Sequence, residues 1–161
     1  MKRNMTSTKT RKSVSSWNPS LAAPFVAKHE GLNLEAYKCP AGEWTIGYGN
    51  TRINGREVRA GDRITKAEAE AMLKAGCARV RSQIADIIHV PVSLGEFTAL
   101  VDFVYNVGIG SFRRSTLLKK LNAARYVDAG YEFLKWKYAA GKELPGLVLR
   151  REDEKAIFLN G

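Results

Sequence analysis

The sequence feature that most limits the fold is a long helical segment in the middle of the chain. Thr65 and Glu68 have the spacing of a capping box, in which each side chain can bond the backbone N–H of the other residue, so a helix is predicted to begin here. The helical pattern then continues without proline to about Ile88. We expect this helix to be the spine of the molecule, connecting two lobes.

The residues before the spine predict a helix followed by a small β lobe. Apolar residues from about Ser20 follow helical spacing, and Gly31 is well suited to end that helix. In residues 36–50 a Pro-Ala-Gly turn separates two short β-prone runs, which is typical of a hairpin. The pair Asn54-Gly55 indicates a further tight turn beside a third strand.

The residues after the spine predict a larger helical lobe. Ser93 and Glu96 have the spacing of a second capping box, and the helix they open is apolar almost all round, as expected for the core of a lobe. Shorter helical patterns follow in residues 115–124, 127–140 and 149–160. The predicted fold class is therefore α+β, with a small β-hairpin lobe and a larger helical lobe joined by a long helix.

The length of 161 residues allows one domain with a sizeable core. We expect residues 18–161 to form this domain as a single bilobal unit. Residues 1–17 are polar and basic without apolar periodicity, which predicts a disordered basic tail that could be attracted to membrane or lipopolysaccharide. The apolar run after them has only seven residues, too few for a membrane span or a signal peptide.

The charge and cysteine content limit the class of partner and the compartment. Twenty-six Lys and Arg residues against sixteen Asp and Glu give a net charge of +10, which favours an anionic partner. Nucleic acid, membrane headgroups and a bacterial envelope polymer all fit, and charge alone does not choose among them. Two cysteines indicate a protein made in a reducing cytoplasm, and two dispersed histidines, His29 and His89, predict no metal site or cofactor.

Three residues around the first predicted hairpin have a spacing that suggests a reaction centre. Glu30 is on the last turn of the first helix, Cys39 follows nine residues later, and Thr45 follows six residues after that. A hairpin that folds back over a helix end can bring such residues to one cleft. Two groups on either side of a glycosidic bond can hydrolyse it, one protonating the leaving oxygen and the other activating water.

This stretch resembles the catalytic region of the phage-type lysozymes, the muramidase endolysins of tailed phages. The shared pattern is Glu-x8-Asp/Cys-x5-Thr followed by "IGYG", with Glu30, Cys39 and Thr45 on its three positions. Three later blocks are also similar to that family: the capped helix from Thr65, "ALVDFVYNVGIGSFRRSTLLKKLN" and "FLKWKYAAGKELPGLVLRREDE". The resemblance covers the chain from about Ser20 to its end.

The resemblance implies a lysozyme-like fold and hydrolysis of the β-1,4 bond between N-acetylmuramic acid and N-acetylglucosamine in peptidoglycan, with inversion. It makes Glu30 the general acid, places Cys39 where many relatives carry Asp, and gives Thr45 a share in holding the attacking water. A surface carboxylate at a helix end remains the alternative for Glu30. A small buried apolar residue remains the alternative for Cys39.

The thiol at position 39 predicts that Cys39 contributes less to catalysis than Glu30 does. The first aspartate of the chain is Asp62, beyond the hairpin, so no aspartate can take this place, and Glu35 and Glu43 are weaker substitutes. A cysteine has a reference pKa near 8.5, which an ionised Glu30 would raise further, so we expect a mostly neutral thiol. Glu30 would then carry most of the catalysis, with Cys39 as an oxidation-sensitive assistant. A disulfide to Cys77 would mask the site.

Further residues fall on family positions that line the sugar cleft. Core packing or capping are alternatives for Thr51, Tyr105 and Ser115, and Asn106 could either face substrate or fix the turn after it. Arg150 and Arg151 resemble family arginines that pair with the catalytic glutamate, with an exposed cationic face as the alternative. The predicted substrate-binding set is Tyr48, Thr51, Tyr105, Asn106, Ser115 and Arg151.

Three other functions compete with hydrolysis. A lytic transglycosylase cleaves the same bond with one glutamate, which suits a chain without a second carboxylate. A basic nucleic-acid-binding domain would explain the charge, but no helix-turn-helix or aromatic-basic strand pattern is present, so we expect no nucleic acid partner. An inactive wall-binding module is the third. The predicted partner is the glycan strand of peptidoglycan, bound by a monomer.

The N-terminus bears on how the protein reaches the wall. Some members of the similar family carry an N-terminal signal-anchor segment, and this chain differs because its N-terminus is polar. We therefore expect accumulation in the host cytoplasm. Holin-dependent release to the periplasm and cell wall would follow, leading to host cell lysis.

Overall fold

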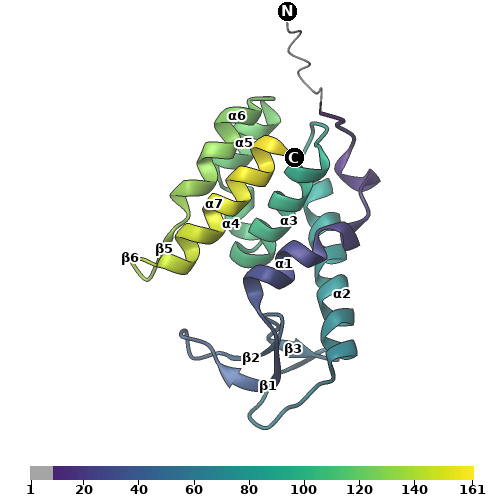
Figure 1. Cartoon of the computed structure of the whole chain (residues 1–161), viewed down its shortest axis with the longest axis vertical. Helices are drawn as coiled ribbons and strands as arrows, with labels where there is room; N and C mark the ends of the chain where they lie inside the picture. Colours follow the sequence, from purple (N-terminus) through teal and green to yellow (C-terminus); the bar gives the residue numbers. More distant parts are fainter. Residues whose placement is uncertain (1–8) are drawn as a thin grey trace, which may run out of the picture.

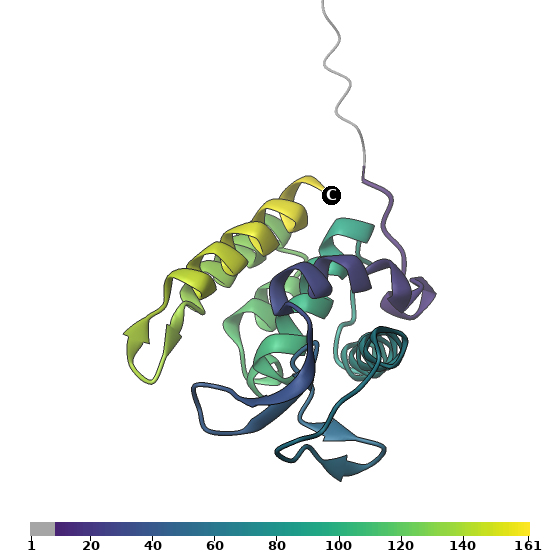
Figure 2. The same cartoon turned by 60° about the horizontal axis from the view of Figure 1, so that its bottom comes forward.

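The computed structural model describes residues 9–161 as two lobes connected by one long helix (Figure 1). The spine is α2, Lys66–Ala85, which runs along one side of the molecule and is seen nearly end-on in Figure 2. Two β hairpins, formed by residues 33–57, lie at one end of it and the remaining helices at the other, where a third hairpin projects from the helical lobe. The predicted α+β class, with a hairpin lobe and a helical lobe, is confirmed.

The spine begins as predicted and ends slightly earlier. Thr65 Oγ1 accepts the backbone N–H of Glu68 at 3.1 Å, which satisfies one of the free donors at the helix start. The α-helix ends at Ala85, since a tight turn on the carbonyl of Ile84 takes over before Ile88. Its buried side chains recur at helical spacing and include Leu73, Cys77, Val80 and Ile84.

The β lobe consists of two separate hairpins. Strand β1, Asn33–Lys38, pairs antiparallel with β2, Trp44–Gly47, and a second pair joins β3, Arg52–Ile53, to β4, Arg56–Glu57. The turn between β3 and β4 is Asn54-Gly55, with φ of 49° and 79°. Positive φ at both central residues is the requirement of the tightest hairpin turn, so the Asn-Gly signal is confirmed.

The helical lobe is built around α3, Leu94–Val107. Its capping box is complete, and all of its residues from Gly95 to Val104 are buried. Four short helices, one further hairpin and the long helix α7 surround or follow it: α4 Ile109–Arg113, α5 Thr116–Asn122, α6 Tyr126–Glu132, the 3-10 helix η3 Phe133–Lys135, β5 Tyr138–Ala139, β6 Lys142–Glu143 and α7 Pro145–Asn160.

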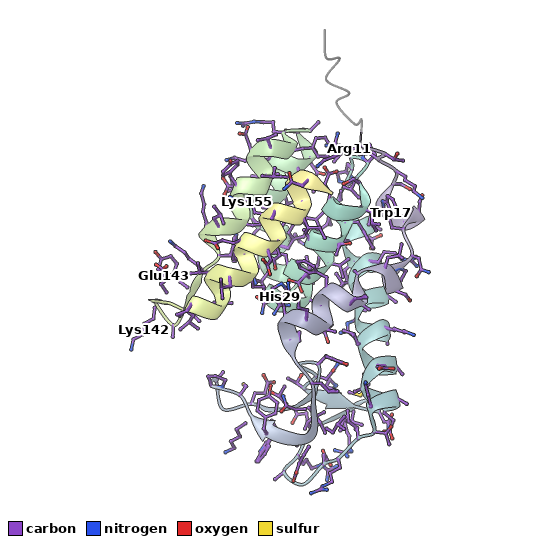
Figure 3. All side chains as sticks on the ribbon, in the orientation of Figure 1. Arg11, Trp17, His29, Lys142, Glu143 and Lys155 are labelled. Carbon is purple, nitrogen blue, oxygen red and sulfur yellow. The ribbon has the colours of Figure 1, made fainter. Side chains whose placement is uncertain are left out.

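The helix expected over residues 127–140 is replaced by a shorter one and a hairpin. Helix α6 ends at Glu132, and η3 carries the chain only to Lys135. Ala140 and Gly141 then adopt φ of 51° and 77°, which turns the chain into β6. The helical spacing of this segment therefore did not predict its second half. Figure 3 shows Lys142 and Glu143 at the tip of the projecting hairpin.

The N-terminal segment corrects the predicted domain boundary. Residues 9–17, expected to belong to a disordered tail over 1–17, pack against the helical lobe; residues 1–8 lie outside the described part. Arg11 donates two short hydrogen bonds of 2.9 Å to Glu96, a fully buried carboxylate at the start of α3. The Trp17 indole donates to the carbonyl of Val92 at 2.9 Å. The basic residues are ordered because a buried carboxylate needs a cation beside it.

The rest of this segment leads to the site. The 3-10 helices η1, Val14–Ser16, and η2, Pro19–Leu21, connect it to α1, Ala23–Glu30. Figure 3 shows Arg11 and Trp17 on the side of the helical lobe away from the β hairpins, and His29 near the end of α1. Among residues 9–161, no helix has both the length and the apolar content to cross a membrane.

We predict that Arg11→Ala lowers the free energy of unfolding by about 2 kcal/mol, because it removes charge-assisted hydrogen bonds from a buried carboxylate. Urea unfolding measures the change. The matched control is Arg125→Ala, which breaks an exposed ion pair with Asp128 and should cost roughly 0.5 kcal/mol or less. Equal small losses in both variants would show that residues 9–17 do not stabilise the domain.

Candidate active site

Glu30 lies where the helical lobe meets the β lobe. It is the last residue of α1, and Gly31 with φ of 71° ends the helix and redirects the chain into β1. Its side chain is 16% exposed. The carboxylate lies directly against the backbone of Gly49, so that a Cβ built on Gly49 would be only 2.5 Å from Glu30 Oε2. The motif after Thr45 therefore supplies the surface on which this carboxylate rests.

Arg150 on α7 holds the other side of the Glu30 carboxylate. Its Nη1 donates to Glu30 Oε1 at 2.9 Å. Its Nε and Nη2 donate to the two oxygens of Asp102 on α3 at 2.9 and 2.8 Å. Of the two arginines expected to pair with the glutamate, Arg150 does so, and Glu30 is not a free surface carboxylate.

Burial is the main influence on the proton affinity of Glu30. Loss of solvent raises the pKa of Glu30 above its ordinary value, and the negative charge of Asp102 raises it further. The nearby guanidinium of Arg150 acts in the opposite direction, through its charge and its hydrogen bond. A carboxyl group with a raised pKa retains a proton at higher pH, which is what a general acid requires.

Cys39 and Thr45 are brought together by the register of the first hairpin. Tyr37 pairs with Thr45, and Cys39 N–H donates to the carbonyl of Glu43 at 2.9 Å. Because side chains alternate along a strand, Cys39 and Thr45 lie on the same face. Thr45 is 5% exposed and donates its hydroxyl to the carbonyl of Glu43 at 3.1 Å. Cys39 is partly exposed and is a free thiol, as is buried Cys77, so no disulfide masks the site.

The expected pKa shift of Cys39 is wrong in direction. The pKa of this thiol is lowered, first by hydrogen bonding from the backbone of Glu43, then by that of Ala41 and by the Thr45 hydroxyl. Two of these local donors, Ala41 and Glu43, belong to the turn of the hairpin and Thr45 belongs to β2, whereas Glu30 is not among the groups that shift this pKa. A lowered pKa increases the thiolate fraction, and a thiolate accepts a hydrogen bond better than a thiol does.

A cleft with a volume of about 550 Å³ opens between the two lobes. Gly49 and Thr51 line it from the β lobe, Val80 from the spine, and Tyr105 and Gly108 from the end of α3. Tyr105 also ties the lobes together, since its hydroxyl donates to the carbonyl of Tyr48 at 2.6 Å. Glu30 adjoins this cleft through Gly49. Of the predicted substrate-binding residues, Thr51 and Tyr105 thus line this cleft.

The other predicted substrate-binding residues have different surroundings. Arg151 is fully buried, packs over the ring of Phe103 and donates to Asn106, so its prediction as a substrate-binding residue is wrong. Ser115 is buried, and its hydroxyl caps α5 by accepting the N–H of Leu118. The side chain of Tyr48 is buried as well, and only Asn106 of this group is exposed. Capping, one of the alternatives from the sequence, is what Ser115 does.

Asp102 is the functional neighbour that sequence reasoning missed. It is fully buried in α3, a helix in which all residues from Gly95 to Val104 are buried and most are apolar. An acid inside such a helix is a signal that a buried cation faces it, since a buried charge requires a partner.

Among the described residues no cluster of three or more His, Cys, Asp or Glu side chains could hold a metal ion.

A carboxylic acid beside a cleft between a β-hairpin lobe and a helical lobe is the arrangement of lysozyme-type glycoside hydrolases. A family model described as phage lysozyme matches residues 27–154 of the chain. The chain belongs to the phage lysozyme family, which confirms the predicted lysozyme-like fold and the predicted enzyme class, a hydrolase that degrades peptidoglycan.

Individual proteins of known identity are similar over most of the chain. An endolysin of Acyrthosiphon pisum secondary endosymbiont phage 1 is 44% identical over 138 residues, covering 83% of this chain and 92% of that protein. A SAR-endolysin of Enterobacteria phage PA-2 is 40% identical over 132 residues, covering 82% and 78%. The solved structure of an endolysin from Escherichia coli O157:H7 phage FAHEc1 has a TM-score of 0.81 at 34% identity, covering 95% and 97%.

We predict that Gly49→Ala lowers kcat/KM on peptidoglycan by roughly 100-fold, because the new methyl group must displace the Glu30 carboxylate. Turbidity loss of a cell-wall suspension measures the rate. Gly55→Ala is the matched control: its φ of 79° is close to the 76° of Gly49, but nothing lies within 4 Å of its Cβ position. Equal losses in the two variants would mean that backbone strain, and not contact with Glu30, causes the effect.

Proposed function

We propose that this protein hydrolyses the β-1,4 bond between N-acetylmuramic acid and N-acetylglucosamine, with Glu30 as general acid. The observation that carries the proposal is a shielded carboxyl group with a raised pKa, held against Gly49 at the edge of the interlobe cleft. In the proposed reaction Glu30 donates its proton to the glycosidic oxygen as the bond breaks. The developing positive charge on the sugar ring is then met by water.

Thr45 and Cys39 are proposed to hold that water on the opposite face of the ring, which gives inversion. The two side chains share one face of the hairpin, and Cys39 is accessible to solvent. Backbone and hydroxyl donors around the sulfur stabilise its thiolate, which makes it a better acceptor for a water proton. Cys39 is therefore proposed to take the place that the resemblance gives to an aspartate, although sulfur accepts a hydrogen bond more weakly than a carboxylate oxygen does.

A lytic transglycosylase is the second candidate. The observation that favours it is the thiol itself, because a single carboxyl group suffices when the hydroxyl of the sugar attacks in place of water. Mass spectrometry of the released muropeptides separates the two functions. A reducing end formed from water supports hydrolysis, and a 1,6-anhydro sugar supports transglycosylation.

The remaining proposals concern where the protein acts. We infer accumulation in the host cytoplasm, holin-dependent release to the cell wall and action as a monomer. The charge of +10 supports attraction to anionic envelope surfaces, which raises encounter rates. Expression of the protein in host cells with and without a holin tests the release route, and lysis without a holin would contradict it.

We predict that Glu30→Gln lowers the rate of wall lysis on the order of a thousandfold, since the amide has no proton to donate. Cys39→Ala should retain part of the activity, and Cys39→Asp should remain active because a carboxylate can serve the same water. Lysis rate and muropeptide analysis measure all three variants. An undiminished Glu30→Gln enzyme would end the proposal.

A further inference from the structure

We propose that Asp102 is a positioning residue for Glu30, holding the Arg150 guanidinium in the one orientation that presents its third nitrogen to the Glu30 carboxylate. This inference rests on the proposed function of Glu30. It assigns a role to a side chain that lies behind the cleft and does not touch the substrate.

The geometry of the guanidinium is the first step. A guanidinium is planar, and two parallel hydrogen bonds along one edge fix both its position and its plane. Asp102 accepts two such bonds, from Nε at 2.9 Å and from Nη2 at 2.8 Å. The remaining nitrogen, Nη1, then points away from Asp102 and reaches Glu30 at 2.9 Å.

Burial is the second step, because it makes this arrangement the only one available. The Arg150 side chain is 7% exposed and that of Asp102 is fully buried, so water cannot replace either partner. Glu154, also fully buried, lies 3.8 Å from Arg150 Nε and provides a weaker contact on the same side. An arginine without Asp102 would lose two charge-assisted hydrogen bonds and the constraint on its plane.

Charge is the third step. Asp102 neutralises part of the positive charge that Glu30 would otherwise face. Because Arg150 lowers the pKa of Glu30 and Asp102 raises it, the two residues act on the same proton in opposite directions. Removing the charge of Asp102 alone should therefore make Glu30 ionise at lower pH, while removing the charge of Arg150 should make it ionise at higher pH.

The other groups around this proton come from four helices. From α7, Arg151 lowers the pKa of Glu30. Glu154 of the same helix faces Arg150, and burial keeps the pKa of Glu154 well above its ordinary value. Tyr105 of α3 is close enough that the charge of Glu30 raises the pKa of the Tyr105 hydroxyl. Cys77 and Arg79 of the spine also shift the pKa of Tyr105. On α1, His29 has a pKa lowered by burial and faces Asp153 at 3.1 Å. The Gly49 segment adds no charge.

The test is the pH profile of kcat/KM on peptidoglycan. Activity is lost as the pH rises through the pKa of the acid, so the midpoint of this alkaline limb reports on Glu30. Asp102→Asn should move the midpoint down by about one pH unit, and Arg150→Gln should move it up by a similar amount. Asp128→Asn makes the same change in an exposed ion pair and should leave the midpoint in place.

A second variant covers the case in which Asp102→Asn does not fold. Asp102→Glu keeps the charge beside Arg150, but its longer side chain shifts the guanidinium, so kcat should fall about tenfold while KM stays within about twofold. Hydrolysis by the unchanged protein combined with an unmoved midpoint in Asp102→Asn, or with full kcat in Asp102→Glu, overturns this inference alone. No hydrolysis by the unchanged protein overturns the proposed function and the inference with it.

Discussion

The structure around the site depends on the guanidinium of Arg150. It receives Glu30 from the first α-helix and Asp102 from the core helix, and it belongs itself to the last helix. Three distant parts of the chain are thus joined at one buried cation. Breaking such a group by removing one partner leaves an uncompensated charge in the interior, which costs far more than an exposed pair does. The proposed general acid, Glu30, is therefore held by the helical lobe in the absence of substrate.

The β lobe adds the second constraint on the same carboxylate. Gly49 lies so close to Glu30 that no side chain would fit between them, and the Tyr48 carbonyl accepts the Tyr105 hydroxyl. These contacts keep the hairpin against the end of α3 and leave the cleft open beside them. The turn and second strand of the hairpin then supply the donors that act on the Cys39 thiol. The proposed acid is thus held by the helical lobe and the proposed water-holding groups by the β lobe, and the two lobes meet at Gly49.

Local sequence signals predicted much of this fold because their physical causes are local. The capping residues Thr65 and Ser93 and the turn Asn54-Gly55 satisfy backbone groups within a few residues, so the spacing alone is informative. The order of residues 9–17 was not predictable in this way, since it depends on Glu96, 85 residues beyond Arg11. The position of Asp102 against Arg150 is equally non-local, since the two residues are 48 positions apart in the sequence.

The choice between Arg150 and Arg151 shows the limit most clearly. Successive residues on a helix point about 100° apart, so only the rotation of α7 against its neighbours decides which arginine faces Glu30.

The most direct test of this account is the pKa of Glu30 in the unchanged protein, followed through its side-chain carboxyl resonance by NMR. The account predicts a value above that of an ordinary glutamate. A value at or below the ordinary one would contradict it.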